Sequence, residues 1–271
     1  MTDETSDRST DQTPDPPTDR PSDSSTNEPS RSARGQRLQH IGEAILVVLG
    51  AYLGAVVVVQ TLNPVVASVA GGGTTSTATV ILTVIQFVTM MVVVGWYVRV
   101  LDVDELIPAF VPGRRAVGLI VAGTVVLLGG QYAVNELLQW AGFSPGANQA
   151  VLAGVGDPIY YLVMIPVSLL FVGPAEELLF RGAVQGRLRQ SWGRWPAIIG
   201  ATIIFGLIHI PAISGGLGGQ LSYALVAGIL GVLLGYLYDY TRNIVVPAVI
   251  HGGYNGALFA LLYLTEIGYF G

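Results

Sequence analysis

The sequence predicts an all-α protein, a polytopic membrane helix bundle of about seven transmembrane helices. Of the 271 residues, 51% are hydrophobic and only 11% are charged, whereas about a quarter of the residues in a typical soluble domain are charged. Most of the seven apolar segments also reach the length of about 20 residues that crosses a hydrocarbon layer of roughly 30 Å. These segments are residues 41–61, 77–98, 115–137, 158–186, 196–211, 220–239 and 244–265, of which the fifth is short and the fourth long and interrupted.

The N-terminal segment, residues 1–38, differs in composition from the apolar body. It is rich in Ser, Thr, Asp and Pro, shows no apolar periodicity, and carries eight acidic residues and two arginines in its first 30 positions. Such a segment cannot bury enough apolar surface to offset its ordering entropy, so we expect a disordered acidic tail. The body then divides into residues 39–140, with three transmembrane helices, and residues 158–265, where the candidate functional residues lie.

The arginines predict the orientation in the membrane. They occur in alternate connecting segments, while the segments between them carry little or no charge. Because basic residues collect in cytoplasmic loops, the pattern predicts a multi-pass protein of the cell membrane with a cytoplasmic N-terminus and an outside C-terminus. The arginines concerned are Arg31, Arg34, Arg37, Arg99, Arg114, Arg115, Arg187, Arg189, Arg194 and Arg242.

A few ionisable side chains fall inside the fourth apolar segment. They are costly in hydrocarbon and usually face a cavity or a partner, so each is a functional candidate. Glu177 and Arg181 are four residues apart and can pair on one helix face, which is also a purely structural explanation for both. Glu176 lies about 100° around the helix from Glu177 and is not served by the same arginine, so it needs another role.

Two further segments add histidines. In the fifth, Phe205 and His209 are one helical turn apart, and in the seventh, His251 and Asn255 share a face across two glycines. A single histidine on an apolar helix is more often a packed residue than a catalyst. However, Glu176, His209 and His251 lie about 14–22 Å along their helices from the nearest arginine of the connecting segments, at a rise of 1.5 Å per residue. We therefore expect them to meet in a cavity near the middle of the membrane or on its cytoplasmic side.

These residues form three motifs in a fixed order, EExxxR, FxxxH and HxxxN. The ordered set resembles the CPBP family of intramembrane proteases, which includes the type II CAAX prenyl endopeptidases and the bacteriocin-related Abi proteins. The resemblance covers roughly residues 158–262. Each motif alone is weak, whereas the complete set on three successive parts of a membrane core is specific.

The resemblance implies an intramembrane endopeptidase that uses a glutamate-activated water. Glu176 would be the general base and His209 would orient the water. His251 and Asn255 would donate to the developing oxyanion, as such side chains do in other hydrolases. Glu177, Arg181 and Phe205 would support the site. The expected partners are a peptide or protein substrate, with or without a lipid group, and the lipid bilayer, but not nucleic acid.

Three alternatives stay open at the level of sequence. Two histidines and a glutamate also match a zinc ligand set, although no local HExxH spacing supports one and we expect no cofactor. The absence of cysteine excludes thiolate zinc sites, disulfides and cysteine nucleophiles. Buried carboxylates in interrupted helices also occur in transporters, but no internal repeat is visible. The third alternative is a non-enzymatic scaffold that keeps the fold and binds a partner.

Overall fold

The computed structural model describes residues 29–270, with side chains from Ala33 onward. The expected disordered tail therefore lies mostly outside the described residues. Its last part differs from the expectation, because helix α1 (Pro29–Val69) includes residues 29–38. This stretch contains good helix formers such as Ala, Arg, Gln and Leu and continues without a break into the apolar segment. The Arg37 guanidinium also donates a 3.3 Å hydrogen bond to the Ser191 carbonyl, which holds this turn against the body.

The described residues form seven helices that are long and apolar enough to cross a membrane, as the sequence predicts. No β-strand occurs among residues 29–270. The helices are α1, α2 (Ser76–Leu101), α3 (Arg114–Trp140), a continuous helix over Pro158–Trp192, α8 (Arg194–Ile208) with its extension η4 (Ile210–Ala212), α9 (Leu217–Thr241) and α10 (Val245–Glu266). The short elements η1 (Asp104–Leu106) and α4 (Gln149–Leu152) lie in the connections that precede and follow α3.

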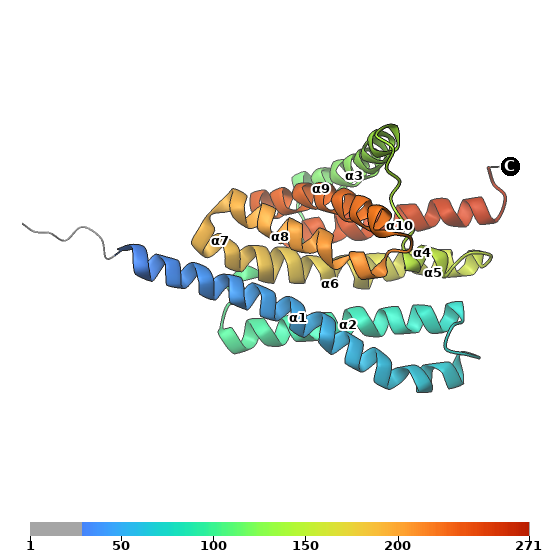
Figure 1. Ribbon diagram of the computed structural model, residues 1–271, viewed down its shortest axis with the longest axis horizontal. Helices are drawn as coiled ribbons and strands as arrows, with labels where there is room; N and C mark the ends of the chain where they lie inside the picture. The colour runs from blue at the N-terminus through green and yellow to red at the C-terminus, as the bar shows by residue number, and fades with distance from the viewer. Residues whose placement is uncertain (1–28, 271) are drawn as a thin grey trace, which may run out of the picture.

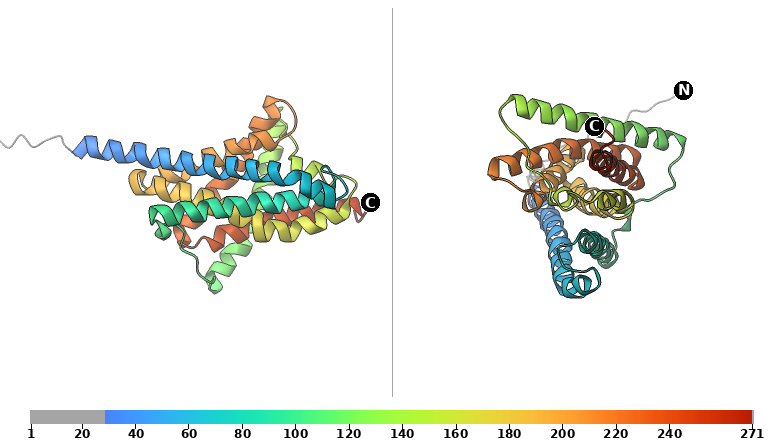
Figure 2. Two further views of the ribbon diagram at one scale, coloured as in Figure 1. Left: turned by 90° about the horizontal axis from the view of Figure 1, so that it is seen from below. Right: turned by 90° about the vertical axis from the view of Figure 1, so that its right-hand side faces the viewer.

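The helix over Pro158–Trp192 lies at the centre of the bundle (Figure 1). Half of the residues in its apolar 18-residue stretch are buried, whereas in α3 the share is 11%. Protein rather than lipid therefore surrounds this helix. The α1–α2 hairpin packs on one side of it, and α8 and α10 pack around the rest. Helix α3 crosses α9 and α10 on the far side from the hairpin (Figure 2).

The central helix changes its winding around the two glutamates. It consists of α5 (Pro158–Val167), η2 (Ser168–Val172), α6 (Gly173–Glu177), η3 (Leu178–Gln185) and α7 (Gly186–Trp192), in which η2 and η3 are π-helical. Pro174 cannot donate a backbone hydrogen bond, and a widened turn accommodates it without ending the helix. The interruption that the sequence predicts in this span is therefore a change of pitch. π-Helical turns inside α-helices are frequent at functional sites.

Two glycines bring α6 and α10 into backbone contact. A Cβ atom added at Gly173 would lie 2.6 Å from the Ala248 carbonyl oxygen and 2.6 Å from the Gly252 nitrogen. One added at Gly252 would lie 2.7 Å from the Ser168 carbonyl oxygen. Only small residues permit such a close approach of two membrane helices. The crossing places the residue before Gly252, His251, beside the end of α6.

A Gly173→Ala substitution should therefore force α6 and α10 apart. We expect a loss of about 1–3 kcal/mol in the free energy of unfolding, the usual cost of overpacking, together with lower activity. Gly95→Ala on α2 is the matched control, because no atom lies within 4 Å of the added methyl. It should be neutral or stabilise by up to about 1 kcal/mol. Denaturant unfolding in detergent measures the free energy of unfolding of both variants. Equal values would contradict the close approach of α6 and α10 at Gly173.

Candidate active site

His251 lies between the two adjacent glutamates of the central helix. Its Nδ1 is 2.9 Å from Glu177 Oε1 and its Nε2 is 3.5 Å from Glu176 Oε2. A carboxylate oxygen can only accept, so Nδ1 carries a hydrogen and donates to Glu177. The second nitrogen is thereby left facing Glu176. The three side chains are at most 8% exposed, so their interactions are made away from bulk solvent.

Glu177 and Arg181 form the buried ion pair that their spacing predicts. Arg181 Nε donates to Glu177 Oε2 at 2.9 Å, and both side chains are fully buried. The guanidinium carbon of Arg181 also lies 5.0 Å from the centre of the Phe205 ring. Because both Glu177 oxygens are engaged, one by Arg181 and one by His251, this glutamate fixes the imidazole. Glu176 has no arginine partner among the described residues.

His209 is oriented by its own helix. Its Nδ1 lies 2.6 Å from the Phe205 carbonyl oxygen, which can only accept, so the hydrogen of a neutral ring is on Nδ1 and Nε2 is left as an acceptor. The Phe205 ring meets the His209 ring edge-to-face at 4.7 Å and the His251 ring at 5.8 Å between centroids. Phe205 is thus the contact shared by both histidines and Arg181. His209 and Glu176 form no ion pair within 4.0 Å in the described part of the chain, and both line the same cavity.

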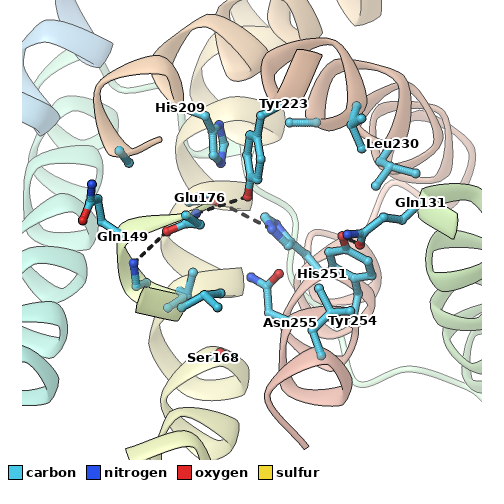
Figure 3. Close-up of a pocket in the computed structure, with 18 of the residues that line it drawn as sticks. Gln131, Gln149, Ser168, Glu176, His209, Tyr223, Leu230, His251, Tyr254 and Asn255 are labelled. Atoms are coloured by element: carbon cyan, nitrogen blue, oxygen red, sulfur yellow. Dashed lines mark hydrogen bonds and ion pairs between the residues drawn. The ribbon is translucent and has the colours of Figure 1, made fainter. Parts of the chain in front are cut away.

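Glu176, His209, His251 and Asn255 all line one cavity of about 840 Å³. Figure 3 shows their side chains arranged around it, from α6, the end of α8 and α10. The cavity does not extend towards the arginine-bearing helix ends. It is lined instead by the 144–151 segment and the adjoining halves of α2 and α3, at the opposite end of the bundle. The four residues thus meet in one cavity, and its depth in the membrane stays a prediction.

The three motifs and the contacts between their side chains belong to one part of the chain. Residues 158–257 match the family model for type II CAAX prenyl endopeptidases, Rce1-like. No curated protein and no solved structure matches the chain. The family supports a general assignment of this protein as a membrane-embedded endopeptidase of the CAAX-protease type, and it confirms the predicted resemblance.

The part of the chain that matches this family model contains functional candidates that the sequence motifs did not reveal. Tyr223 of α9 lies 5.9 Å from His209 between ring centroids, and its hydroxyl accepts a 3.1 Å hydrogen bond from Asn148. Tyr254 donates to Gln131 of α3, and both residues line the cavity. Tyr254 lies within the HGGYN motif, so the sequence could have indicated it as a residue of the site. Tyr223 has no motif around it, and only the packing of α9 against α8 brings it to His209.

The ligands for a resident metal ion do not converge. Among the described residues, no three His, Asp or Glu side chains are placed to hold one ion. The nitrogens of His251 face two carboxylates, and Nδ1 of His209 is engaged by a backbone carbonyl. The remaining donors, His209 Nε2 and Glu176, come from two different helices. This donor set fits hydrogen-bond chemistry better than tetrahedral zinc coordination, which needs three or four convergent ligands.

Proposed function

We propose that this protein hydrolyses peptide bonds within the membrane with a water molecule activated by Glu176. The observation that carries the proposal is the placement of the Glu176 carboxylate in the wall of the cavity, without an arginine partner and 3.5 Å from His251 Nε2. A carboxylate that is not neutralised by a cation is available to accept a proton. His209 Nε2, in the lining of the same cavity, can hold this water by accepting its second hydrogen.

In this mechanism Glu176 removes a proton from the water as its oxygen attacks the carbonyl carbon of the substrate. The carbonyl oxygen becomes an oxyanion, to which the Asn255 amide can donate. His251 can donate from Nε2 as well when its ring is doubly protonated, because its Nδ1 hydrogen goes to Glu177. The C–N bond then breaks, and the proton held by Glu176 passes to the leaving amine. Glu177 and Arg181 take no part in proton transfer and act by holding the His251 ring.

The assignment is tested by cleavage itself. Purified protein in detergent should cut a set of fluorogenic peptides, prenylated and plain, at internal bonds identified by mass spectrometry. The comparison of the two peptide groups also shows whether a lipid group is needed. If no peptide is cut, while reconstituted vesicles show solute uptake that depends on Glu176, the protein is a carrier and the proposal is wrong.

We further propose that the reaction needs no metal ion. The absence of a convergent ligand set among the described residues supports this. Cleavage is therefore expected to continue at an unchanged rate after dialysis against a strong chelator and in its presence. Loss of activity on chelation, with recovery on adding Zn²⁺ but not Mg²⁺, would instead establish the zinc-dependent alternative.

We propose that the arginine-bearing end of the bundle faces the cytoplasm, so that the cavity opens towards the outer side. The start of α1 and the end of α10 lie at opposite ends of the bundle, which fits an odd number of spans (Figure 1). The natural absence of cysteine makes this directly measurable. In intact cells an impermeant maleimide should label Thr74→Cys, in the α1–α2 turn, but label Val111→Cys, at the arginine end, only after permeabilisation. The reverse pattern would invert the orientation.

A further inference from the structure

Two exposed arginines at one end of the bundle share a single buried carboxylate. Arg189 of α7 contacts Asp239 of α9 at Oδ1, and Arg194 of α8 contacts the same carboxylate at Oδ2, 2.9 Å from its Nε. The Asp239 side chain is 6% exposed, whereas the arginine side chains are 40% and 38% exposed. A carboxylate has about four acceptor sites, fewer than the donors of two guanidiniums. A surplus of positive charge and of N–H donors is therefore left at the surface.

Three exposed aromatic rings lie beside these arginines. Trp195 of α8 stacks on Tyr236 of α9 with 6.2 Å between ring centroids, and Tyr236 stacks on Tyr240 at 6.3 Å. The guanidinium carbon of Arg194 lies 5.4 Å from the centre of the Trp195 ring and 4.8 Å from that of Tyr236, within the range of cation–π attraction. Arg194 is thus held by two rings and a carboxylate before any ligand binds. A side chain fixed in advance loses less conformational entropy on binding.

This cluster lies where three spanning helices end. Helix α7 ends at Trp192, α8 begins at Arg194, and α9 ends at Thr241. The turn from α7 to α8 is at the left end of the bundle in Figure 1. The ends of spanning helices lie at the level of the lipid headgroups, where Trp and Tyr are enriched. Basic pockets between helices at this level are typical sites for anionic lipid headgroups.

An apolar row continues from the cluster along the exposed side of α8. Its members are exposed and four residues apart, so they share one helix face: Trp195, Ile199, Ile203 and Leu207. A ligand with a charged end and a long apolar part would contact both the arginines and this row. A phospholipid has that form, whereas a soluble phosphate compound or an acidic peptide lacks the apolar part.

We infer that this end of the bundle binds the headgroup phosphate of an anionic phospholipid, with an acyl chain along the apolar row of α8. The binding residues, which we call the Arg194 surface, are Arg189, Arg194, Trp195, Tyr236, Asp239 and Tyr240. None of them lines the cavity around Glu176. The inference is therefore independent of the proposed peptidase function, and lipid binding can be measured without any cleavage.

The net charge of the Arg194 surface decides the class of lipid. Its two arginines and Asp239 leave a single positive charge, and the small cavity beside Arg189 adds Arg242 and Glu105, whose charges cancel. Phosphatidylglycerol has a single negative charge and complements this surface. Phosphatidylcholine has the same phosphate, but its choline group would bring a cation close to the arginines. We therefore expect the surface to select phosphatidylglycerol.

Native mass spectrometry of the delipidated full chain in detergent tests this selection. Titration with phosphatidylglycerol should give saturable binding of one lipid per chain. Its Kd should be at least about 5-fold lower than that of phosphatidylcholine, which corresponds to about 1 kcal/mol for one surplus charge near the membrane surface. Glycerol 1-phosphate, which presents a phosphate without acyl chains, should not displace the lipid. Absence of saturable binding, equal affinities for the two lipids, or displacement by equimolar glycerol 1-phosphate would each overturn the inference.

Two variants locate the site. Arg194→Gln removes the surplus charge while Asp239 keeps Arg189 as its partner, so the Kd for phosphatidylglycerol should rise about 5-fold and the preference over phosphatidylcholine should be lost. Trp195→Leu keeps the charge and the apolar row but removes one ring from Arg194, and the Kd should rise about 2–5-fold. Size-exclusion profiles in detergent establish that both variants are folded. An unchanged Kd in both would overturn the inference.

Arg114→Gln is the matched control. Arg114 is exposed at the start of α3, and the segment before it reaches the same end of the bundle, since the Phe110 nitrogen donates to Asn243 Oδ1 just beyond α9. Within residues 29–270 no aromatic ring is in cation–π contact with Arg114. Its substitution should leave the Kd unchanged. Equal weakening by Arg114→Gln and Arg194→Gln would show a diffuse attraction to anionic lipid and would exclude a site at the Arg194 surface.

Discussion

A Glu176→Gln variant is expected to fold normally and to lose about 10²–10⁴-fold in kcat, the usual contribution of a positioned general base. Glutamine has nearly the same shape as glutamate, so the cavity wall and the contact with His251 are kept. It cannot accept a proton from water, and so the attacking hydroxide is no longer formed. Since substrate contacts elsewhere in the cavity are unchanged, KM should stay close to that of the wild type.

The control for this prediction is Glu136→Gln on α3. Glu136 is an acid in a membrane helix that is exposed and does not line the cavity, so its substitution should leave kcat unchanged. Steady-state cleavage rates measure both variants, and size-exclusion profiles in detergent establish that both are folded. Wild-type kcat in Glu176→Gln would remove this residue from the mechanism. Glu177 could not replace it, because Glu177 is fully buried and both of its oxygens are engaged.

An Arg181→Met variant is expected to lose about 3–5 kcal/mol in the free energy of unfolding. Methionine fills part of the same space but leaves the Glu177 carboxylate as a buried charge without its cation, and this is the costly way to break a buried ion pair. The His251 ring, held by the same glutamate at 2.9 Å, should lose its fixed position. Activity should therefore fall together with stability. Denaturant unfolding in detergent and the cleavage assay measure the two effects.

Two further variants separate the ion pair from general packing. Adding Glu177→Gln to Arg181→Met removes the unpaired charge and should recover part of the lost stability, although not the activity. Arg187→Met, on the same helix, breaks the pair between Arg187 and Glu43, whose side chains are 11% and 17% exposed. Water can partly replace that partner, so the loss should be smaller. If the Arg187→Met and Arg181→Met variants lose the same free energy of unfolding, the complete burial of the Arg181–Glu177 pair does not explain the loss.

The membrane architecture follows from the sequence because the bilayer imposes strict local rules. A spanning segment must be long, apolar and helical, since no other open backbone satisfies its hydrogen bonds in hydrocarbon. All seven spans could therefore be counted from composition alone. The ionisable site candidates could also be identified, because buried ionisable groups are rare and one-turn spacings mark shared helix faces. Phe205 and Asn255 were added by the motifs on which the resemblance rests. The pairing of Glu177 with Arg181 is local in this sense and was predicted.

The tertiary structure alone decided how the helices meet. The backbone contact between Gly173 and Gly252 joins segments that are far apart in sequence, and no local pattern states which glycines face one another. That crossing sets His251 on Glu177 and leaves its second nitrogen to Glu176. The position of Tyr223 could likewise not be predicted, because no motif surrounds it and only the packing of α9 against α8 brings it to His209.

The sequence by itself thus determined the spans, the ordered motifs and the residues that could not be left in lipid without a partner. The structure decided which partner each one has, where the cavity lies and which end of the bundle it approaches. The physical reason is the range of the forces involved. Hydrophobic length, helix periodicity and charge cost act within one helix, whereas close packing and hydrogen-bond direction depend on surfaces brought together from several helices.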